Sequence, residues 1–276
     1  MRYAIIAAGE GSRLASEGID VPKPLVRVCG EPLIDRLIRV FMDNDATDIL
    51  VICNDLTTLV SSHLESLQRN GLHGRPVPLR FIVKSTPSSM HSFFELSKML
   101  EDRGARREER GKDKGRETEP FVLTTVDTIF REEEFSRYVA AFAASEADGL
   151  MGVTDFIDDE KPLYVGTDAE LNITGFYDEL GVKEERGERR EERESSKFKE
   201  PAPVYISGGI YGLTAPALAT LRGCMERGES RMRNFQRALI RDGLRLVAWP
   251  FSKVLDIDHA SDVEKAERFL EERGES

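Results

Sequence analysis

The fold is decided by Tyr3-Ala4-Ile5-Ile6-Ala7-Ala8-Gly9-Glu10-Gly11-Ser12-Arg13-Leu14 and by Pro22-Lys23-Pro24-Leu25, which follows shortly after. Residues 3–8 are apolar without a helical period, which predicts a short buried strand ending in a glycine-rich loop. Glycine lets the backbone approach a ligand closely, and converging amide N–H groups bind phosphate oxygens. Arg13 and Lys23 add positive charge beside those amides. The stretch therefore predicts a site for an anionic ligand at the carboxyl end of the first strand.

The glycine spacing alone is a weak signal, because a tight turn is the commoner reason for two glycines after a strand. Gly9-x-Gly11 lacks the third glycine of a dinucleotide-binding fingerprint, and the absence of a Gly-Lys-Ser/Thr sequence excludes a P-loop. The later Pro22-Lys23-Pro24-Leu25 makes a phosphate-binding loop a better explanation than a tight turn. The two clusters together resemble the signature of sugar-phosphate nucleotidyltransferases (nucleotide-sugar pyrophosphorylases and MobA-like NTP transferases) and their cytidylyltransferase relatives.

The resemblance implies both a fold and a reaction. The fold would be a single three-layer α/β/α domain over residues 1–276, GT-A-like and Rossmann-like, with a mixed, mostly parallel sheet. The enzyme would transfer a nucleoside monophosphate from a nucleoside triphosphate to a sugar phosphate or similar phosphorylated alcohol, release pyrophosphate and use Mg²⁺. Arg13 and Lys23 would be catalytic. The residues expected to bind the nucleotide are Ala7, Ala8, Gly9, Gly11, Ser88 and Ser89.

The composition is that of an ordinary globular protein. The 276 residues are 40% hydrophobic and 32% charged, enough for one large α/β domain. The net charge of −11 argues against a general nucleic-acid binder, although a local basic cluster remains compatible with a nucleotide. The three cysteines show no metal-binding spacing. No apolar run reaches the roughly 20 residues that span a bilayer, so we expect no membrane partner and a cytoplasmic location.

Hydrophobic periodicity predicts helices alternating with short strands along the rest of the chain. The predicted helices are 33–41, 56–68, 89–100, 132–144, 215–226 and 231–242, followed by a closing helix after residue 260. The predicted strands are 49–53, 79–83, 121–126, 149–153, 204–213 and 244–249, with a hairpin of 163–165 and 171–177. Residues 101–119 and 181–200 are so rich in charge that we expect two mobile, solvated insertions, although exposed helix is an alternative.

Three aspartates are candidate metal ligands. Asp127 follows a strand, and Asp256-x-Asp258 precedes the closing helix, where it resembles the family's C-terminal metal motif. Oxygen ligands with few histidines suit Mg²⁺, and Asp256 is expected to assist Asp127 and Asp258. The Val126-Asp127 pair departs from the family's usual small residue before this aspartate.

Other polar residues have simpler explanations. Ser261 with Glu264 predicts the cap of the closing helix. Ser88 and Ser89 fit a helix cap as well as a nucleotide contact. His63 fits a packing or surface role better than catalysis, and Lys161 is a weak candidate for the acceptor phosphate. We expect an exposed Lys23, so that Lys23→Met lowers turnover about tenfold or more without lowering the melting temperature.

Two other classes of protein remain as alternatives. One is a non-catalytic nucleotide or sugar-nucleotide sensor of the same fold, which loss of a metal carboxylate would favour. The other is a glycosyltransferase of related fold, whose Asp-x-Asp motif lies in mid-chain rather than near the C-terminus. The sequence specifies neither the base, the acceptor nor the oligomeric state.

Overall fold

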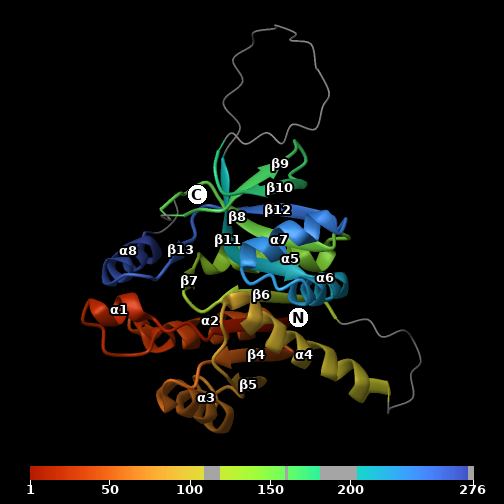
Figure 1. Ribbon diagram of the computed structural model, residues 1–276. Coiled ribbons are helices and arrows are strands. Elements are labelled where there is room, and N and C mark those ends of the chain that lie inside the picture. Colours follow the sequence, from red (N-terminus) through yellow and green to blue (C-terminus); the bar gives the residue numbers. More distant parts are fainter. Residues whose placement is uncertain (109–118, 159–160, 181–203, 273–276) are drawn as a thin grey trace, which may run out of the picture.

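The computed structural model describes residues 1–108, 119–158, 161–180 and 204–272 (Figure 1). Its strands are β1 (Arg2–Ala7), β2 (Arg27–Val28), β3 (Glu31–Pro32), β4 (Asp48–Cys53), β5 (Leu79–Val83), β6 (Phe121–Thr125), β7 (Thr128–Ile129), β8 (Gly149–Thr154), β9 (Tyr164–Thr167), β10 (Ile173–Tyr177), β11 (Tyr205–Leu213), β12 (Leu246–Phe251) and β13 (Leu255–Asp256). Its α-helices are α1 (Ser12–Ser16), α2 (Leu33–Asp43), α3 (Thr58–Asn70), α4 (Ser89–Glu108), α5 (Glu132–Ala144), α6 (Ala215–Glu226), α7 (Met232–Arg241) and α8 (Ala260–Glu271). A 3₁₀ turn, η1, spans Lys23–Leu25.

One mixed sheet forms the centre of the molecule. Its main order is β10-β9-β11-β6-β1-β4-β5, and β8 pairs with both β11 and β12. β1 pairs in parallel with β4 and β6, and β4 pairs in parallel with β5. β11 is antiparallel to β6, β8 and β9, and β10 is antiparallel to β9, whereas β12 is parallel to β8. All strands of this sheet except β10 and β11 therefore run in one direction, which confirms a mixed, mostly parallel sheet.

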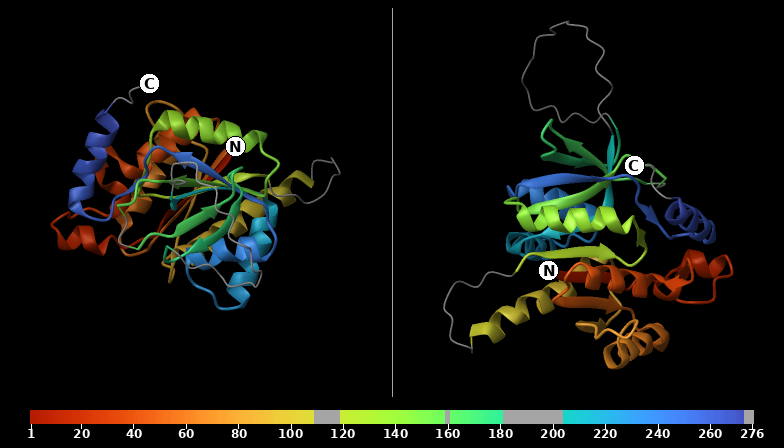
Figure 2. Two further views of the ribbon diagram at one scale, coloured as in Figure 1. Left: turned by 90° about the horizontal axis from the view of Figure 1, so that it is seen from above. Right: turned by 180° about the vertical axis from the view of Figure 1, so that it is seen from behind.

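Alternate residues of β1 enter two separate cores. Tyr3, Ile5 and Ala7 pack with side chains of α2, α3, α5 and α8, whereas Ala4 and Ile6 pack with those of α4, α6 and α7. Figure 2 shows helices on both faces of the sheet. Because both faces are buried, β1 reads as a continuous apolar run, and the expected three-layer α/β/α fold is confirmed.

The described residues cover only part of the two predicted insertions. Residues 101–108 continue α4 rather than leaving it, so the helix runs eight residues beyond the predicted end. Residues 109–118 and 181–203 lie outside the described residues. Among the described residues, no helix combines the length and apolar character that crossing a bilayer requires.

The start of the closing helix differs from the prediction. The N-cap of α8 is His259 rather than Ser261. Asp262 accepts hydrogen bonds from the backbone N–H groups of Asp258 (3.1 Å) and His259 (2.8 Å), as the third residue of a capping box does. The Ser261–Glu264 pair matches the same pattern two residues later, but the chain is already helical there.

Two details concern α3. It begins at Thr58 rather than Leu56, and Leu56 and Leu59 are more than half exposed instead of packed. His63 lies 2.5 Å from the Asp35 carboxylate of α2 through its Nε2 atom. This pair links two helices, which agrees with the packing or surface role predicted for His63.

Candidate active site

The glycine-rich loop is shaped by contact with η1. Gly11 has a φ of +65°, which favours glycine, and a Cβ atom there would lie 3.1 Å from the Cβ atom of Lys23. The backbone of Lys23 is held between two prolines, and Leu25 N–H donates to the Pro22 carbonyl at 2.8 Å. The loop and the lysine are therefore close neighbours, as the sequence pattern predicted.

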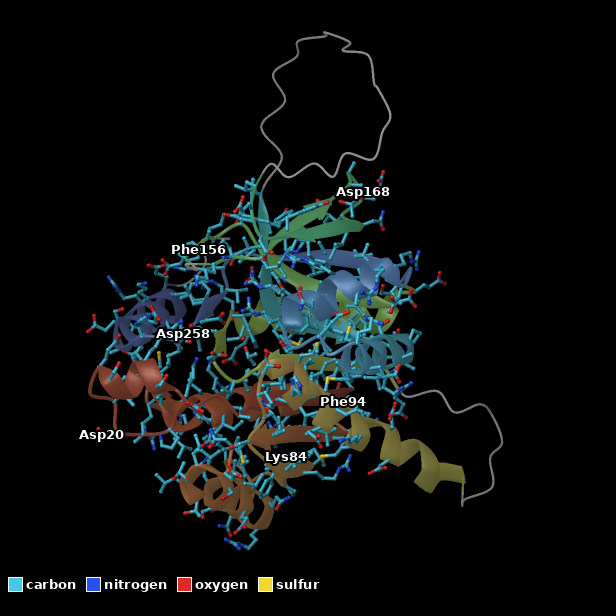
Figure 3. The ribbon with its side chains drawn as sticks, viewed as in Figure 1. Asp20, Lys84, Phe94, Phe156, Asp168 and Asp258 are labelled. Carbon is cyan, nitrogen blue, oxygen red and sulfur yellow. The ribbon has the colours of Figure 1, made fainter. Side chains whose placement is uncertain are left out.

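Lys23 joins two of the predicted metal ligands. Its Nζ atom donates to Oδ2 of Asp127 and, at 2.7 Å, to Oδ1 of Asp258. Arg13 donates from Nη1 to the other oxygen of Asp258 at 3.0 Å. Figure 3 places Asp258 on the side of the molecule where α1 and α8 lie. The structure thus brings together Arg13, Lys23, Asp127 and Asp258, which come from four separate segments of the chain.

Burial and charge act in opposite directions at this cluster. The Lys23 side chain is only 10% exposed, so the prediction of an exposed lysine is wrong. Burial lowers the pKa of Lys23, but the charges and hydrogen bonds of Asp127 and Asp258 outweigh it and raise this pKa to about 12. Burial raises the pKa of Asp258, whereas Lys23 and Arg13 together bring it below its usual value. Lys23 is therefore a fixed positive charge, and Asp258 an ionised carboxylate, at neutral pH.

A small ladder brings the C-terminal carboxylates to Asp127. β13 pairs antiparallel with β7, which aligns Asp256 with Thr128, and Ile257 N–H donates to the Asp127 carbonyl at 3.2 Å. The Asp127 turn is also held by a 2.7 Å hydrogen bond between the hydroxyls of Thr125 and Thr128. Asp256 is exposed, and its assisting role stays a prediction.

Gly209 supports the same turn from β11. Its φ is +70°, and a Cβ atom would lie 3.3 Å from the Thr128 hydroxyl. We expect Gly209→Ala to cost about 1–2 kcal/mol of stability through backbone strain and to lower turnover about tenfold, because it displaces the Asp127 turn. Gly228→Ala is the matched control, with a φ of +71° and no neighbouring atom within 4 Å. Steady-state kinetics measures turnover, and urea unfolding measures stability. Equal turnover of the two variants would contradict this role of Gly209.

The residues predicted to bind the nucleotide lie along the same edge of the sheet. Asn54, which the sequence analysis missed, follows β4 and donates to the carbonyls of Ala8 (3.3 Å) and Gly9 (3.2 Å). The Ser88 hydroxyl lies 2.8 Å from Nδ1 of His91, and Ser89 is the first residue of α4. Ser88 therefore has a local partner at the helix start, and nucleotide contact by Ser88 and Ser89 stays a prediction.

A cavity of about 410 Å³ opens beside Asp258. Its walls include Arg13, Asp256, Asp258 and the candidate Lys161 together with side chains that the sequence analysis did not single out, among them Thr154, Phe156, Ser207, Arg233 and Lys265. The Ser207 hydroxyl donates to Oε1 of Gln236 at 3.0 Å, and Gln236 is 3% exposed. A buried amide therefore fixes the orientation of one cavity hydroxyl.

The donor set fits a hard cation that shares its coordination with a substrate. Among the described residues, no three His, Cys, Asp or Glu side chains form a preformed metal cluster. Asp127 and Asp258 nevertheless approach one ammonium from two sides, so their oxygens lie close together. Mg²⁺ keeps several waters and commonly uses one or two carboxylates plus substrate phosphates, which is what this pair offers.

Comparisons with known proteins agree with the fold. The family model of the MobA-like NTP transferase domain matches residues 3–239. The chain is 23% identical over 291 residues to the UTP–glucose-1-phosphate uridylyltransferase AglF of Haloferax volcanii, covering 99% of this chain and 97% of that protein.

Two solved structures are also similar. One is a putative glucose-1-phosphate thymidylyltransferase from Bacillus anthracis, with 19% identity, a TM-score of 0.72 and coverage of 100% of this chain and 97% of that one. The other is the inositol-1-phosphate CTP transferase from T. maritima, with 18% identity and a TM-score of 0.66. The match covers 98% of this chain and 96% of that one. The fold expected from the sequence is thus shared along nearly the whole chain.

Proposed function

The chain belongs to the MobA-like NTP transferase domain family, and from this premise we propose that it transfers a nucleoside monophosphate to a sugar phosphate or polyol phosphate. An acceptor phosphate oxygen attacks the α-phosphorus of the nucleoside triphosphate. The bond from that phosphorus to the bridging oxygen breaks, and pyrophosphate leaves. The observation that carries the proposal is the convergence of Arg13, Lys23, Asp127 and Asp258 beside the glycine-rich loop.

Positioning and charge neutralisation are the main tasks of such a site, because both substrates are anions. Lys23 supplies a compact ammonium to the transferring phosphate, and Arg13 a guanidinium to the β- and γ-phosphates. Asp127 and Asp258 would hold Mg²⁺, which would supply Lewis-acid stabilisation of phosphate charge. Asp256 orients this pair from the neighbouring strand.

The cavity beside Asp258 is the candidate site for the acceptor. Its volume of about 410 Å³ is in the range of small-ligand sites. Lys161 and Arg233 contribute positive charge to its walls, and the Ser207 hydroxyl, whose proton is donated to Gln236, offers an acceptor for a ligand hydroxyl. These groups suit a phosphorylated polyhydroxyl compound.

Nucleoside triphosphates are cytoplasmic substrates, and a cytoplasmic location accords with this proposal.

A pyrophosphate-release screen tests the proposal. ATP, CTP, GTP, UTP and dTTP are each combined with glucose 1-phosphate and inositol 1-phosphate in the presence of Mg²⁺. We expect release for at least one pair that depends on both substrates and on Mg²⁺. Asp258→Asn serves as the inactive control. Nucleotide binding without release for any pair would instead support a non-catalytic sensor.

A further inference from the structure

Lys23 occupies the space between the two carboxylates expected to bind the metal. Its ammonium donates to Asp127 and Asp258, and the side chains of Lys23 and Asp127 are only 10% and 17% exposed. One positive charge therefore already pairs with both carboxylates, of which Asp127 is largely buried and Asp258 is 46% exposed. A divalent cation and this ammonium would compete for the same oxygens.

The ammonium of Lys23 is held by hydrogen bonds to Asp127 and, at 2.7 Å, to Asp258. The ammonium needs other anionic partners before it gives up these carboxylates. A Cβ atom built on Gly11 would lie 3.1 Å from the Cβ atom of Lys23, so the glycine-rich loop passes close to the lysine. Triphosphate oxygens bound by this loop would be within reach of the ammonium.

We propose that Lys23 has a second, positioning role: in the nucleotide-free protein it holds Asp127 and Asp258 together and excludes a divalent cation until a triphosphate draws its ammonium away. The inference rests on the proposed function, because it takes these aspartates as metal ligands. The prolines on either side fix the backbone of Lys23, while its four-carbon stem stays free to turn. Metal and nucleotide then raise each other's affinity reciprocally.

Mn²⁺ binding without nucleotide tests this role, with free Mn²⁺ measured by electron paramagnetic resonance. We expect Lys23→Met to bind Mn²⁺ about tenfold or more tightly than the wild type, because the substitution removes the cation that Asp127 and Asp258 share and leaves Asp258 with Arg13. Lys23→Met combined with Asp127→Asn should lose this gain. Lys98→Met, which removes an exposed lysine of α4, should bind Mn²⁺ as the wild type does.

Adding a nucleotide should raise the Mn²⁺ affinity of the wild type to that of Lys23→Met. With α,β-methylene analogues of the five triphosphates, wild-type protein should bind Mn²⁺ in at least one case as tightly as Lys23→Met does without them. Equal Mn²⁺ affinity of wild type and Lys23→Met without nucleotide would overturn the positioning role and leave the metal centre standing. Failure of every form to bind Mn²⁺ with any analogue would instead overturn the proposed metal centre.

Thermal unfolding gives an independent readout. Without metal, the melting temperature of Lys23→Met should lie below that of the wild type, and Mg²⁺ should restore it. The melting temperature of the nucleotide-free wild type should not change with Mg²⁺. A Lys23→Met protein that melts like the wild type and ignores Mg²⁺ would contradict the inference. Lys23→Gln serves for the same measurements if Lys23→Met does not fold.

Discussion

Asp127→Asn is expected to lower turnover by about 10²–10³-fold, the scale of losing one preorganised electrostatic contact in a transition state. Asparagine keeps the shape of the side chain but lacks the negative charge that a Mg²⁺ ligand supplies. Lys23 retains Asp258 as a partner, so the fold should survive. Steady-state kinetics at saturating Mg²⁺, with circular dichroism to confirm folding, measures both effects.

Asp256→Asn is the matched control for this expectation. It changes an aspartate of the same C-terminal segment that is exposed and aligned with Thr128. Asp258→Asn should resemble Asp127→Asn, whereas Asp256→Asn should lose less activity. Near-normal turnover of Asp127→Asn would show that the catalytic centre lies elsewhere.

The sequence predicted the glycine-rich loop because its signal is local. The apolar run of β1, the glycines after it and the proline-flanked lysine lie within the first 25 residues. Strand and helix positions followed from periodicity in the same way, and α6 was predicted with its bounds as found. Local patterns were sufficient wherever the determining contacts lie between near neighbours.

The convergence of Asp127 and Asp258 could not be derived from spacing. It depends on the pairing of β13 with β7, two strands of two residues each, for which the sequence carries no hydrophobic pattern. Only the family resemblance suggested that the two carboxylates meet. The burial of Lys23 was missed for the same reason, because the groups that cover it come from distant segments.

The cap of α8 shows a different limit. Both His259-x-x-Asp262 and Ser261-x-x-Glu264 place an acidic residue three positions after a polar one. The preceding strand ends at Asp256, and Glu17 accepts hydrogen bonds from the Ala260 N–H and approaches the His259 ring, both at 2.6 Å. These tertiary contacts select the earlier start, which a local pattern cannot reveal.

A buried ion pair at the opposite end of the sheet was also missed. Arg2 begins β1 and Asp48 begins β4, and their side chains are 3% and 1% exposed. Arg2 donates to Asp48 at 3.3 Å and to the Leu100 carbonyl at 2.6 Å, which links the first strand to α4. Arg80 donates two further hydrogen bonds to Asp48, at 2.6 and 3.0 Å. Burial lowers the pKa of Arg2, and Asp48 opposes this shift.

Asp48→Ala is therefore expected to lower the free energy of unfolding by about 3–5 kcal/mol, the cost of leaving a buried charge without its partner. Asp43→Ala is the control: Asp43 pairs with Arg75 at 2.6 Å but is 43% exposed, so its loss should cost at most about 1 kcal/mol. Urea unfolding measures both. Asp48 lies at the amino end of β4 and the proposed catalytic residues lie beyond the carboxyl ends of β1 and β6, so the folded variant should keep its turnover. Equal destabilisation by the two substitutions would show that the Arg2–Asp48 pair contributes no more than a surface ion pair, and lost turnover in folded Asp48→Ala would show that the two ends of the sheet are coupled.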